Sequence, residues 1–380
     1  MKAYVFPGQG SQYKGMGKGL FEQYGDMVQQ ADTVLGYSIA ELCLDDPERK
    51  LGFTEYTQPA LYVVNALSYQ EEIKKTKHLP GCLAGHSLGE YNALQASGAI
   101  SFKDGLKMVK KRGELMSQAP KGAMAAILGS TENEIEWLLK NNDLSTVDVA
   151  NYNLHDQTVI SGLEEDIARA QSIFSEGNIK FIPLNANGAF HSHYMKPAAT
   201  EFKKYIHQFT FSPLEIDVIS NVQAQPYTQE EIKENLVNQI THSVKWSESI
   251  RHMMKLGVTE FKELGAGHVL TALIEKIQAH TRTADKVIDT AIDIESTEVN
   301  LSSDNKPAIE DAKKTVTAWN NDWPVGTSVS CKNHGEILKT RTQAILLFDR
   351  KATIYMQGYK GYFDLADVQP VSEKKMSVDS

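Results

Sequence analysis

Apolar positions follow two different periods along residues 1–278 of the chain. Short apolar runs with strand character alternate with longer segments in which apolar residues recur at helical spacing. Ala3–Phe6 is expected to be the first strand, and Gln58–Leu67 a helix with Pro59 near its start, where the missing N–H costs little. A strand at Cys82–Ala84 precedes a turn and the helical spacing of Glu90–Ala96. The alternation predicts an α/β domain built on a parallel sheet.

The pattern changes between residues 123 and 190, where the apolar runs become short and strand-like. The runs are AMAAILG, STVDVANYN, QTVISG and KFIPL, and two helical patterns lie between them, Glu132–Lys140 and Glu164–Ser175. The resulting order, βαββαβ, is typical of a ferredoxin-like unit. We therefore expect a ferredoxin-like subdomain at residues 123–190, inserted into a large subdomain made of residues 1–122 and 191–280.

The last hundred residues differ from the rest in composition and in the spacing of their apolar runs. Residues 281–314 are polar and rich in acidic side chains, which predicts a linker. Residues 315–372 hold several short strand-like runs at close spacing, which predicts a small β-barrel or SH3-like module, followed by a tail at 373–380. Four aromatic side chains in this module are expected to be exposed: Tyr355, Tyr359, Tyr362 and Phe363.

Composition disfavours nucleic acid as a partner and also bears on membrane insertion and location. The chain has 380 residues and a net charge of −9, which disfavours nucleic acid because phosphate binding needs clustered Lys and Arg. No segment approaches ~20 consecutive apolar residues, so no membrane span is expected. The N-terminal apolar stretch is too short for a signal peptide. The three cysteines are widely spaced, which fits neither a disulfide framework nor a zinc site and favours a reducing, cytoplasmic location.

The turn Gly85-His86-Ser87-Leu88-Gly89 carries the first candidate chemistry. It has the pattern G-x-S-x-G between a predicted strand and a predicted helix, which is the context of a nucleophile elbow in α/β-hydrolase-like folds. Glycines relieve the crowding of such a turn, and the N–H groups at the start of the helix can bind an oxyanion. The alternative is an ordinary serine in a glycine-rich turn.

A serine nucleophile requires a base, and the chain has 11 histidines. His86 adjoins Ser87, but neighbouring residues on a sharp turn point apart, so a structural role is expected for it. His191 and His193 lie in the polar loop NANGAFHSHYMKPAA, and spacing alone leaves the two equal as candidates. Three others have no distinguishing context: His242, His252 and His268.

Arg112 lies at the edge of the apolar face of a predicted helix, in DGLKMVKKRGELMSQ. Glu114 points away from it around that helix. An arginine beside an apolar stripe must find an anion, because an unpaired buried charge is costly. The hypotheses are a side chain that extends along the rim of the core to reach solvent, or a guanidinium that takes a substrate carboxylate in a bidentate pair.

Together, these segments resemble the malonyl-CoA:acyl-carrier-protein transacylase family over residues 1–278. The matching motifs are YVFPGQGSQYKGMG, TQPALY, AGHSLGEYNAL, KKRGELM, FHSHYMKPAA, VKW and ELGAGHVLTALI, in the family's order. GHSLGEYNAL and RGELMSQAPKGAMAAILG are most similar to the free-standing, trans-acting acyltransferases that serve polyketide synthases without built-in acyltransferase domains.

The resemblance implies a role for each candidate. In the family the base lies four positions before the methionine of His-x-x-x-Met-Lys-Pro, which is His191 here, with Met195 following. His193 then has no counterpart. Gln239 aligns with the residue whose backbone carbonyl orients the histidine, so no triad aspartate is needed.

The substrate contacts are likewise implied by the family. Arg112 matches the arginine that pairs with the malonyl carboxylate, and Gln58 a glutamine of the same pocket. The backbone N–H groups of Gln9 and Leu88 match the oxyanion hole. Phe190, in Gly-Ala-Phe-His, resembles malonyl-selecting domains and would narrow the pocket against an α-methyl group, a discrimination of only ~1–3 kcal/mol.

The expected activity is ping-pong transfer of malonyl from malonyl-CoA, through a Ser87 ester, to the phosphopantetheine thiol of an acyl carrier protein, in polyketide or fatty acid synthesis. It needs no metal or bound redox cofactor. The alternative is an acyl hydrolase that clears stalled carrier proteins, which has no use for a carboxylate-binding arginine. For the C-terminal module, docking to a synthase or carrier protein and simple stabilisation of the catalytic part stay open.

Overall fold

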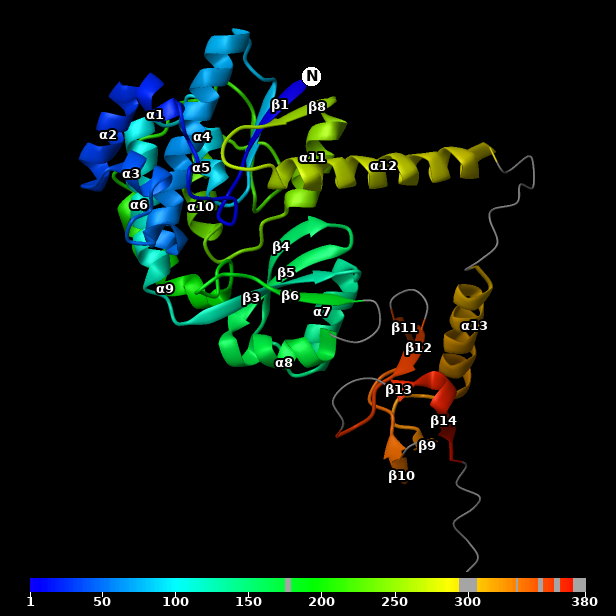
Figure 1. The fold of residues 1–380 in the computed structure, drawn as a ribbon. Coiled ribbons are helices and arrows are strands. Elements are labelled where there is room, and N and C mark those ends of the chain that lie inside the picture. Colours follow the sequence, from blue (N-terminus) through cyan, green and yellow to red (C-terminus); the bar gives the residue numbers. More distant parts are fainter. Residues whose placement is uncertain (175–178, 294–305, 333, 348–350, 359–362, 372–380) are drawn as a thin grey trace, which may run out of the picture. The chain divides into compact units, whose positions relative to one another are not determined.

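The computed structural model describes the chain except residues 175–178, 294–305, 333, 348–350, 359–362 and 372–380 (Figure 1). Two compact units account for it. One comprises Met1–Glu132 and Leu144–Asp289, and the other Asn133–Asp143 and Thr290–Ser380. In the described part of the chain, no helix combines the length and the apolar character needed to cross a membrane.

A four-stranded parallel sheet forms the centre of the first unit. Its order is β7 (Val218–Ile219), β2 (Cys82–Gly85), β1 (Lys2–Phe6) and β8 (Glu260–Glu263), with every neighbouring pair parallel. The parallel sheet predicted from the sequence is confirmed. Because β1 and β2 are each followed by a loop at the same edge of the sheet, residues just after these strands converge there.

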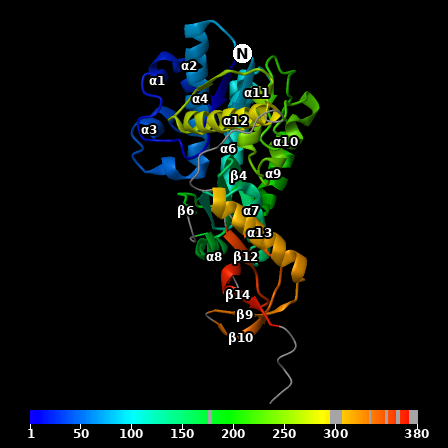
Figure 2. The same ribbon diagram turned by 90° about the vertical axis from the view of Figure 1, so that its right-hand side faces the viewer.

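Helices cover both faces of this sheet (Figures 1 and 2). Tyr4 and Phe6 of β1 face one core, whereas Ala3 and Val5 face the other, as the period of two in a strand requires. The helices of the first unit are α1 (Leu20–Gln23), α2 (Gly25–Leu35), α3 (Ile39–Leu44), α4 (Thr54–Thr76), α5 (Gly89–Ala96), α6 (Phe102–Ser117), α8 (Glu164–Phe174), α9 (Lys196–Ile206), α10 (Ile232–Asn238), α11 (Trp246–Lys255) and α12 (Val269–Asp293).

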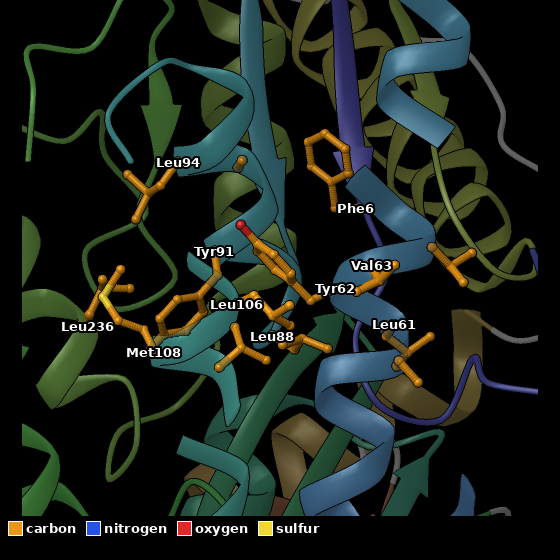
Figure 3. Packing of buried hydrophobic residues seen from close by; sticks show 14 of the residues in the cluster. Phe6, Leu61, Tyr62, Val63, Leu88, Tyr91, Leu94, Leu106, Met108 and Leu236 are labelled. Atoms are coloured by element: carbon orange, nitrogen blue, oxygen red, sulfur yellow. The ribbon is translucent and has the colours of Figure 1, made fainter. Parts of the chain in front are cut away.

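The larger core lies between β1, α4, α5 and α6. Figure 3 shows Phe6, Tyr62 of α4, Leu88, Tyr91 of α5 and Leu106 of α6 packed together, and all are buried. The helix predicted at residues 58–67 is confirmed, but it begins at Thr54. This core holds α5 and α6 against the sheet and so fixes the positions of the residues they carry.

The small sheet is antiparallel. Its elements follow the predicted order βαββαβ: β3 (Gly122–Leu128), α7 (Glu132–Asn141), β4 (Asp148–Leu154), β5 (Gln157–Leu163), α8 and β6 (Lys180–Pro183). The strand order is β4-β5-β3-β6, with every neighbouring pair antiparallel. Val244, just before α11, forms an isolated parallel bridge with Asn151 of β4.

The expected linker is helical at both of its described ends. The helix α12 continues to Asp293, and α13 runs from Lys306 to Asp322. The acidic composition led to the prediction of a linker. Charged residues can nevertheless form a helix when an apolar stripe packs it against the rest of the protein. Leu270, Leu273, Ile274 and Ile277 provide that stripe for α12. Val316 and Trp319 of α13 pack against the C-terminal core.

Short antiparallel strands fill the C-terminal segment, as predicted. One sheet has the order β10 (His334–Lys339), β9 (Ser328–Cys331) and β14 (Val368–Pro370). The other has the order β11 (Ile345–Leu347), β12 (Lys351–Ile354) and β13 (Phe363–Asp364). The buried side chains of both sheets form one small core with α13.

The prediction of exposed aromatics is wrong for Tyr355. Its side chain is 0% exposed, and its ring packs edge-on against Trp137 with the centroids 4.5 Å apart. Ile354, at the end of β12, and the two residues that follow it, Tyr355 and Met356, are all buried. Phe363 is half-buried against the same core. Tyr359 and Tyr362 lie outside the described residues.

Candidate active site

Ser87 occupies a sharp turn between β2 and α5. Its φ is 52°, a left-handed conformation that costs energy for a residue with a Cβ. A Cβ at Gly85 would lie 1.9 Å from the backbone carbon of Gly89, and one at Gly89 would lie 2.0 Å from the Phe6 carbonyl oxygen. Both glycines are therefore required for the turn, which has the strand–turn–helix geometry predicted from the sequence.

Asn221 holds this turn from the loop after β7. The Ser87 N–H donates to its Oδ1 at 2.7 Å, and its Nδ2 donates to the Gly85 carbonyl at 2.6 Å. Asn221 is 1% exposed, so water does not compete for these bonds. This residue was not predicted from the sequence, because a single asparagine after a short strand carries no distinguishing signal.

His191 lies against the serine. Its Nε2 is 2.8 Å from Ser87 Oγ, and its Nδ1 is 2.7 Å from the Gln239 carbonyl and 3.1 Å from the His242 carbonyl. Since carbonyl oxygens only accept, Nδ1 carries the proton and Nε2 is free to accept from the serine hydroxyl. Sequence spacing left His191 and His193 equal as candidates for the base, and the structure places His191, rather than His193, in contact with Ser87.

The imidazole of His191 is held in its neutral form. Burial, followed by the positive charge of Arg112, lowers its pKa from 6.5 to about 3. The carbonyl of Gln239 opposes this effect by accepting from Nδ1. At neutral pH, the group beside Ser87 is therefore an unprotonated base.

This depressed pKa predicts an unusual pH profile for Ser87. The rate of modification of free enzyme by an uncharged serine reagent, such as a sulfonyl fluoride, should stay level from about pH 8 to about pH 5. If the base had the ordinary pKa of histidine, ~6.5, the rate of modification would fall to half around that pH. The measurement is the inactivation rate at each pH, with a Ser87→Ala variant to show that the label is on Ser87. A half-maximal rate near pH 6.5 would contradict the assignment.

The other histidines have different partners. His86 Nε2 lies 3.0 Å from Asn153 Oδ1, and its ring packs on Trp246 at 5.4 Å. His193 is exposed, and its Nδ1 lies 2.6 Å from Asp148 Oδ2. His242 places its own Nδ1 2.8 Å from the Asn238 carbonyl. Neither His252 nor His268 lines the cavity around Ser87.

Arg112 of α6 is buried, with 1% of its surface exposed. Its NH1 donates to Gln58 Oε1 at 2.6 Å, and its NH2 donates to Gln239 Oε1 at 2.9 Å and to Ser87 Oγ at 3.1 Å. The hypothesis of an arginine that reaches solvent is therefore wrong. Among the described residues, no carboxylate forms an ion pair with Arg112. A buried guanidinium with only neutral acceptors favours an incoming anion.

These groups line one cavity of about 440 Å³. Its walls include Ser87, His191 and Arg112, together with four more residues singled out from the sequence: Gln9, Gln58, Leu88 and Phe190. Within the described part of the chain, the backbone N–H groups of Gln9 and Leu88 have no hydrogen-bond acceptor. Two free N–H groups at the edge of a cavity that contains a serine can donate hydrogen bonds to a developing oxyanion.

Glu90, in the first turn of α5, is a buried carboxylate that was not predicted from the sequence. It is 0% exposed and accepts from the Asn221 N–H at 2.7 Å, from the Tyr227 hydroxyl at 2.9 Å and from the Gln239 side-chain amide. Burial raises its pKa to about 7, against the effect of these donors and of Arg112. A glutamate in a helix ordinarily faces solvent, so no sequence signal identified it.

Comparison with known proteins adds independent findings. The model of the acyl transferase domain family matches residues 3–299. The polyketide biosynthesis malonyl CoA-acyl carrier protein transacylase PksC of Bacillus subtilis is 52% identical over 280 residues, covering 73% of this chain and 97% of the relative.

Solved structures agree. A malonyl CoA-acyl carrier protein transacylase from Burkholderia pseudomallei has a TM-score of 0.72 and 48% identity, covering 73% of this chain and 98% of that one. A malonyl-transacylase in complex with a type II polyketide acyl-carrier protein has a TM-score of 0.70 and 34% identity, covering 73% of this chain and 92% of that one.

Proposed function

This chain belongs to the acyl transferase domain family, and on that premise we propose that it transfers malonyl groups from malonyl-CoA to the phosphopantetheine thiol of an acyl carrier protein. The observation that carries the proposal is the contact among Ser87, His191 and Arg112 in one cavity. A nucleophile, a neutral base and a buried cation without a carboxylate partner are the parts that such a transfer needs. The 52% identity to a polyketide malonyl transacylase supports polyketide synthesis as its setting.

The first half-reaction forms an ester on Ser87. Its Oγ attacks the thioester carbonyl of malonyl-CoA while its proton passes to His191 Nε2, 2.8 Å away. The N–H groups of Gln9 and Leu88 hold the oxyanion of the tetrahedral intermediate. The C–S bond then breaks, and the thiolate of CoA leaves with the proton from Nε2. Arg112 holds the distal carboxylate throughout, beside Gln58.

The second half-reaction reverses these steps with a new acceptor. The thiol of the carrier protein's phosphopantetheine gives its proton to His191 Nε2, and its sulfur attacks the ester carbonyl. The C–O bond breaks, and Ser87 Oγ recovers a proton from the imidazolium. The carbonyl of Gln239 stabilises that imidazolium through Nδ1–H. No step requires a metal or a redox cofactor.

Phe190 supports a preference for malonyl over branched acyl groups. Its side chain is 6% exposed and lines the cavity next to His191. A bulky ring at this place leaves less room for an α-methyl group. The expected discrimination is ~1–3 kcal/mol, roughly 10- to 200-fold.

The alternative function, acyl hydrolysis, is less well supported. A hydrolase uses water as the acceptor and has no need for a carboxylate-binding group. Burying Arg112 without a carboxylate ion-pair partner is costly, and a carboxylate-bearing acyl group would offset that cost.

One experiment tests the proposal and separates it from hydrolysis. The purified protein is incubated with a mixture of acetyl-, malonyl- and methylmalonyl-CoA, and the Ser87 peptide is analysed by mass spectrometry. Malonyl-Ser87 is expected to dominate, and added phosphopantetheinylated carrier protein should then acquire the malonyl group. Release of free CoA and malonate without malonyl carrier protein would overturn the transferase assignment.

For the C-terminal segment we propose docking to a synthase. Val325 and Ile337 are 51% and 53% exposed in this unit, whereas Tyr355 is buried and does not contribute. A chain ended between α12 and α13 should keep its turnover with free carrier protein but lose association with the synthase in a pull-down. An insoluble product would instead assign the segment a stabilising role. A cut at residue 314 is unsuitable for this test, because it would divide α13.

A further inference from the structure

Among the residues that the structure describes, the two oxygens of Glu90 have only donors as partners. The backbone N–H of Asn221 and the hydroxyl of Tyr227 donate to Oε1, at 2.7 and 2.9 Å. The side-chain amide of Gln239 donates to Oε2. No step of the proposed reaction uses this carboxylate, although it lies one residue beyond Gly89 of the elbow. The three donors favour the ionised form of this acid and oppose the effect of burial, which raises its pKa to about 7.

The amide of Gln239 has one orientation only while Glu90 is ionised. Its Nε2 donates to Glu90 and, at 2.8 Å, to the Ser87 carbonyl. Its Oε1 therefore points the other way and accepts from Arg112 NH2 at 2.9 Å. If the amide were reversed, two donors would face each other at the Arg112 end and Ser87 O would lose its donor.

We propose that Glu90 is a positioning residue that aligns Arg112 for the acyl carboxylate by fixing the orientation of the Gln239 amide. The inference rests on the proposed function and deepens it. Glu90 acts through another side chain and does not touch the substrate. On this proposal it governs which acyl group is accepted, while the hydrogen bond between Ser87 Oγ and His191 Nε2 includes neither Glu90 nor the Gln239 amide.

The substitution Glu90→Gln isolates this role, because it keeps the size of the side chain. The backbone N–H of Asn221 cannot reverse, so the new carbonyl must stay on the Asn221 side. The new NH2 then faces Gln239 Nε2, donor against donor, so the Gln239 amide must either turn over or shift away, and each movement disturbs its hydrogen bond with Arg112 NH2. Removing a negative charge near Arg112 would by itself strengthen the binding of an anion. A loss of malonyl preference can therefore come only from geometry.

The experiment compares Glu90→Gln in two backgrounds, wild type and Gln239→Met. Methionine keeps the length of Gln239 and its backbone carbonyl but has no amide to orient. The quantity measured is the ratio of Ser87 acylation rates, malonyl-CoA over acetyl-CoA. We expect the ratio to fall by about tenfold or more in the wild-type background and not to fall in the Gln239→Met background.

Either of two results overturns the proposal. The ratio falls by the same factor in both backgrounds, which would mean that Glu90 acts through the fold, or it does not fall in the wild-type background. Tyr227→Phe is the matched control, since it removes one donor to Glu90 and leaves the Gln239 amide in place: its ratio at high pH, where Glu90 is ionised, should be unchanged, and the pH at which the ratio falls should move upward because that donor lowers the pKa of Glu90. Failure of wild type to form malonyl-Ser87 would instead reject the proposed function itself.

A second measurement keeps the test independent of whether Glu90→Gln folds. Protonation of Glu90 also places a donor opposite Gln239, and its pKa is raised to about 7. The ratio in the wild-type enzyme should therefore be high above about pH 8 and fall below about pH 6, while Gln239→Met shows no such fall. The other groups around Glu90 titrate elsewhere: the pKa values of Tyr91 and Tyr227 are raised, and that of His191 is lowered to about 3. Arg112 stays charged throughout. A ratio that is constant with pH in the wild-type enzyme would overturn the proposal.

Discussion

Ser87→Ala is expected to eliminate the acyl-enzyme and to lower the transfer of malonyl to carrier protein by about 10³-fold or more. Without Oγ there is no atom to receive the acyl group, and His191 Nε2 and Arg112 NH2 each lose a partner within 3.1 Å. Alanine adopts the φ of 52° at the same cost as serine, so the turn should persist.

The measurement for Ser87→Ala is twofold: the rate of malonyl carrier-protein formation, and the mass of the protein after incubation with malonyl-CoA. Ser97→Ala is the matched control. Ser97 is also buried, and it lies at the C-terminal end of α5, the helix that follows the Ser87 turn. Its hydroxyl donates to the Leu94 carbonyl at 2.9 Å, and it does not line the cavity. It should retain nearly full activity. A malonyl adduct that persists in Ser87→Ala would show that another residue is the nucleophile.

Arg112→Ala should reverse the acyl preference of the enzyme. The ratio of acylation by malonyl-CoA to acylation by acetyl-CoA is expected to fall by about 100-fold or more, because truncating one partner of a buried charge pair costs ~2–5 kcal/mol. Arg112→Lys should lie between the two, since a lysine keeps the charge but loses the planar fork that donates to Gln58 and Gln239 together.

The readout for Arg112 is competition between the two thioesters, with both acyl-Ser87 products quantified in one sample. Lys111→Ala provides the control, as Lys111 is the neighbouring cation on α6, is half-exposed and lies 3.9 Å from Glu114. Its acyl ratio should not change. An unchanged ratio in Arg112→Ala would remove Arg112 from carboxylate binding.

The elbow could be predicted from the sequence because its geometry allows few residue types. A Cβ at residue 85 or 89 would overlap backbone atoms, so the turn requires the two glycines that make its pattern visible in the sequence. The βαββαβ order could be predicted because period and length separate strands from helices. The choice between His191 and His193 could not be made from spacing, because it depends on a contact between residues 104 positions apart in the sequence, Ser87 and His191.

Other parts of the site depend on tertiary contacts that leave no local pattern. Glu90 and Asn221 are 131 positions apart, and their bond exists only because β2 and β7 are adjacent in the sheet. The helix α13 was not predicted for a different reason. Its polar surface is typical of a linker, and its few apolar residues are recognised as a helix face only once the strands that they pack against are known.

If Arg112 binds the acyl carboxylate as proposed, its position would link the charge of the acyl group to the pKa of His191. After burial, its positive charge is the foremost cause of the low pKa of His191, and a bound carboxylate cancels part of that charge. The imidazole then becomes more basic just when the thioester lies next to Ser87. A thioester without a carboxylate would leave the pKa of His191 low. On the proposed function, we therefore expect discrimination against neutral thioesters in the chemical step as well as in affinity.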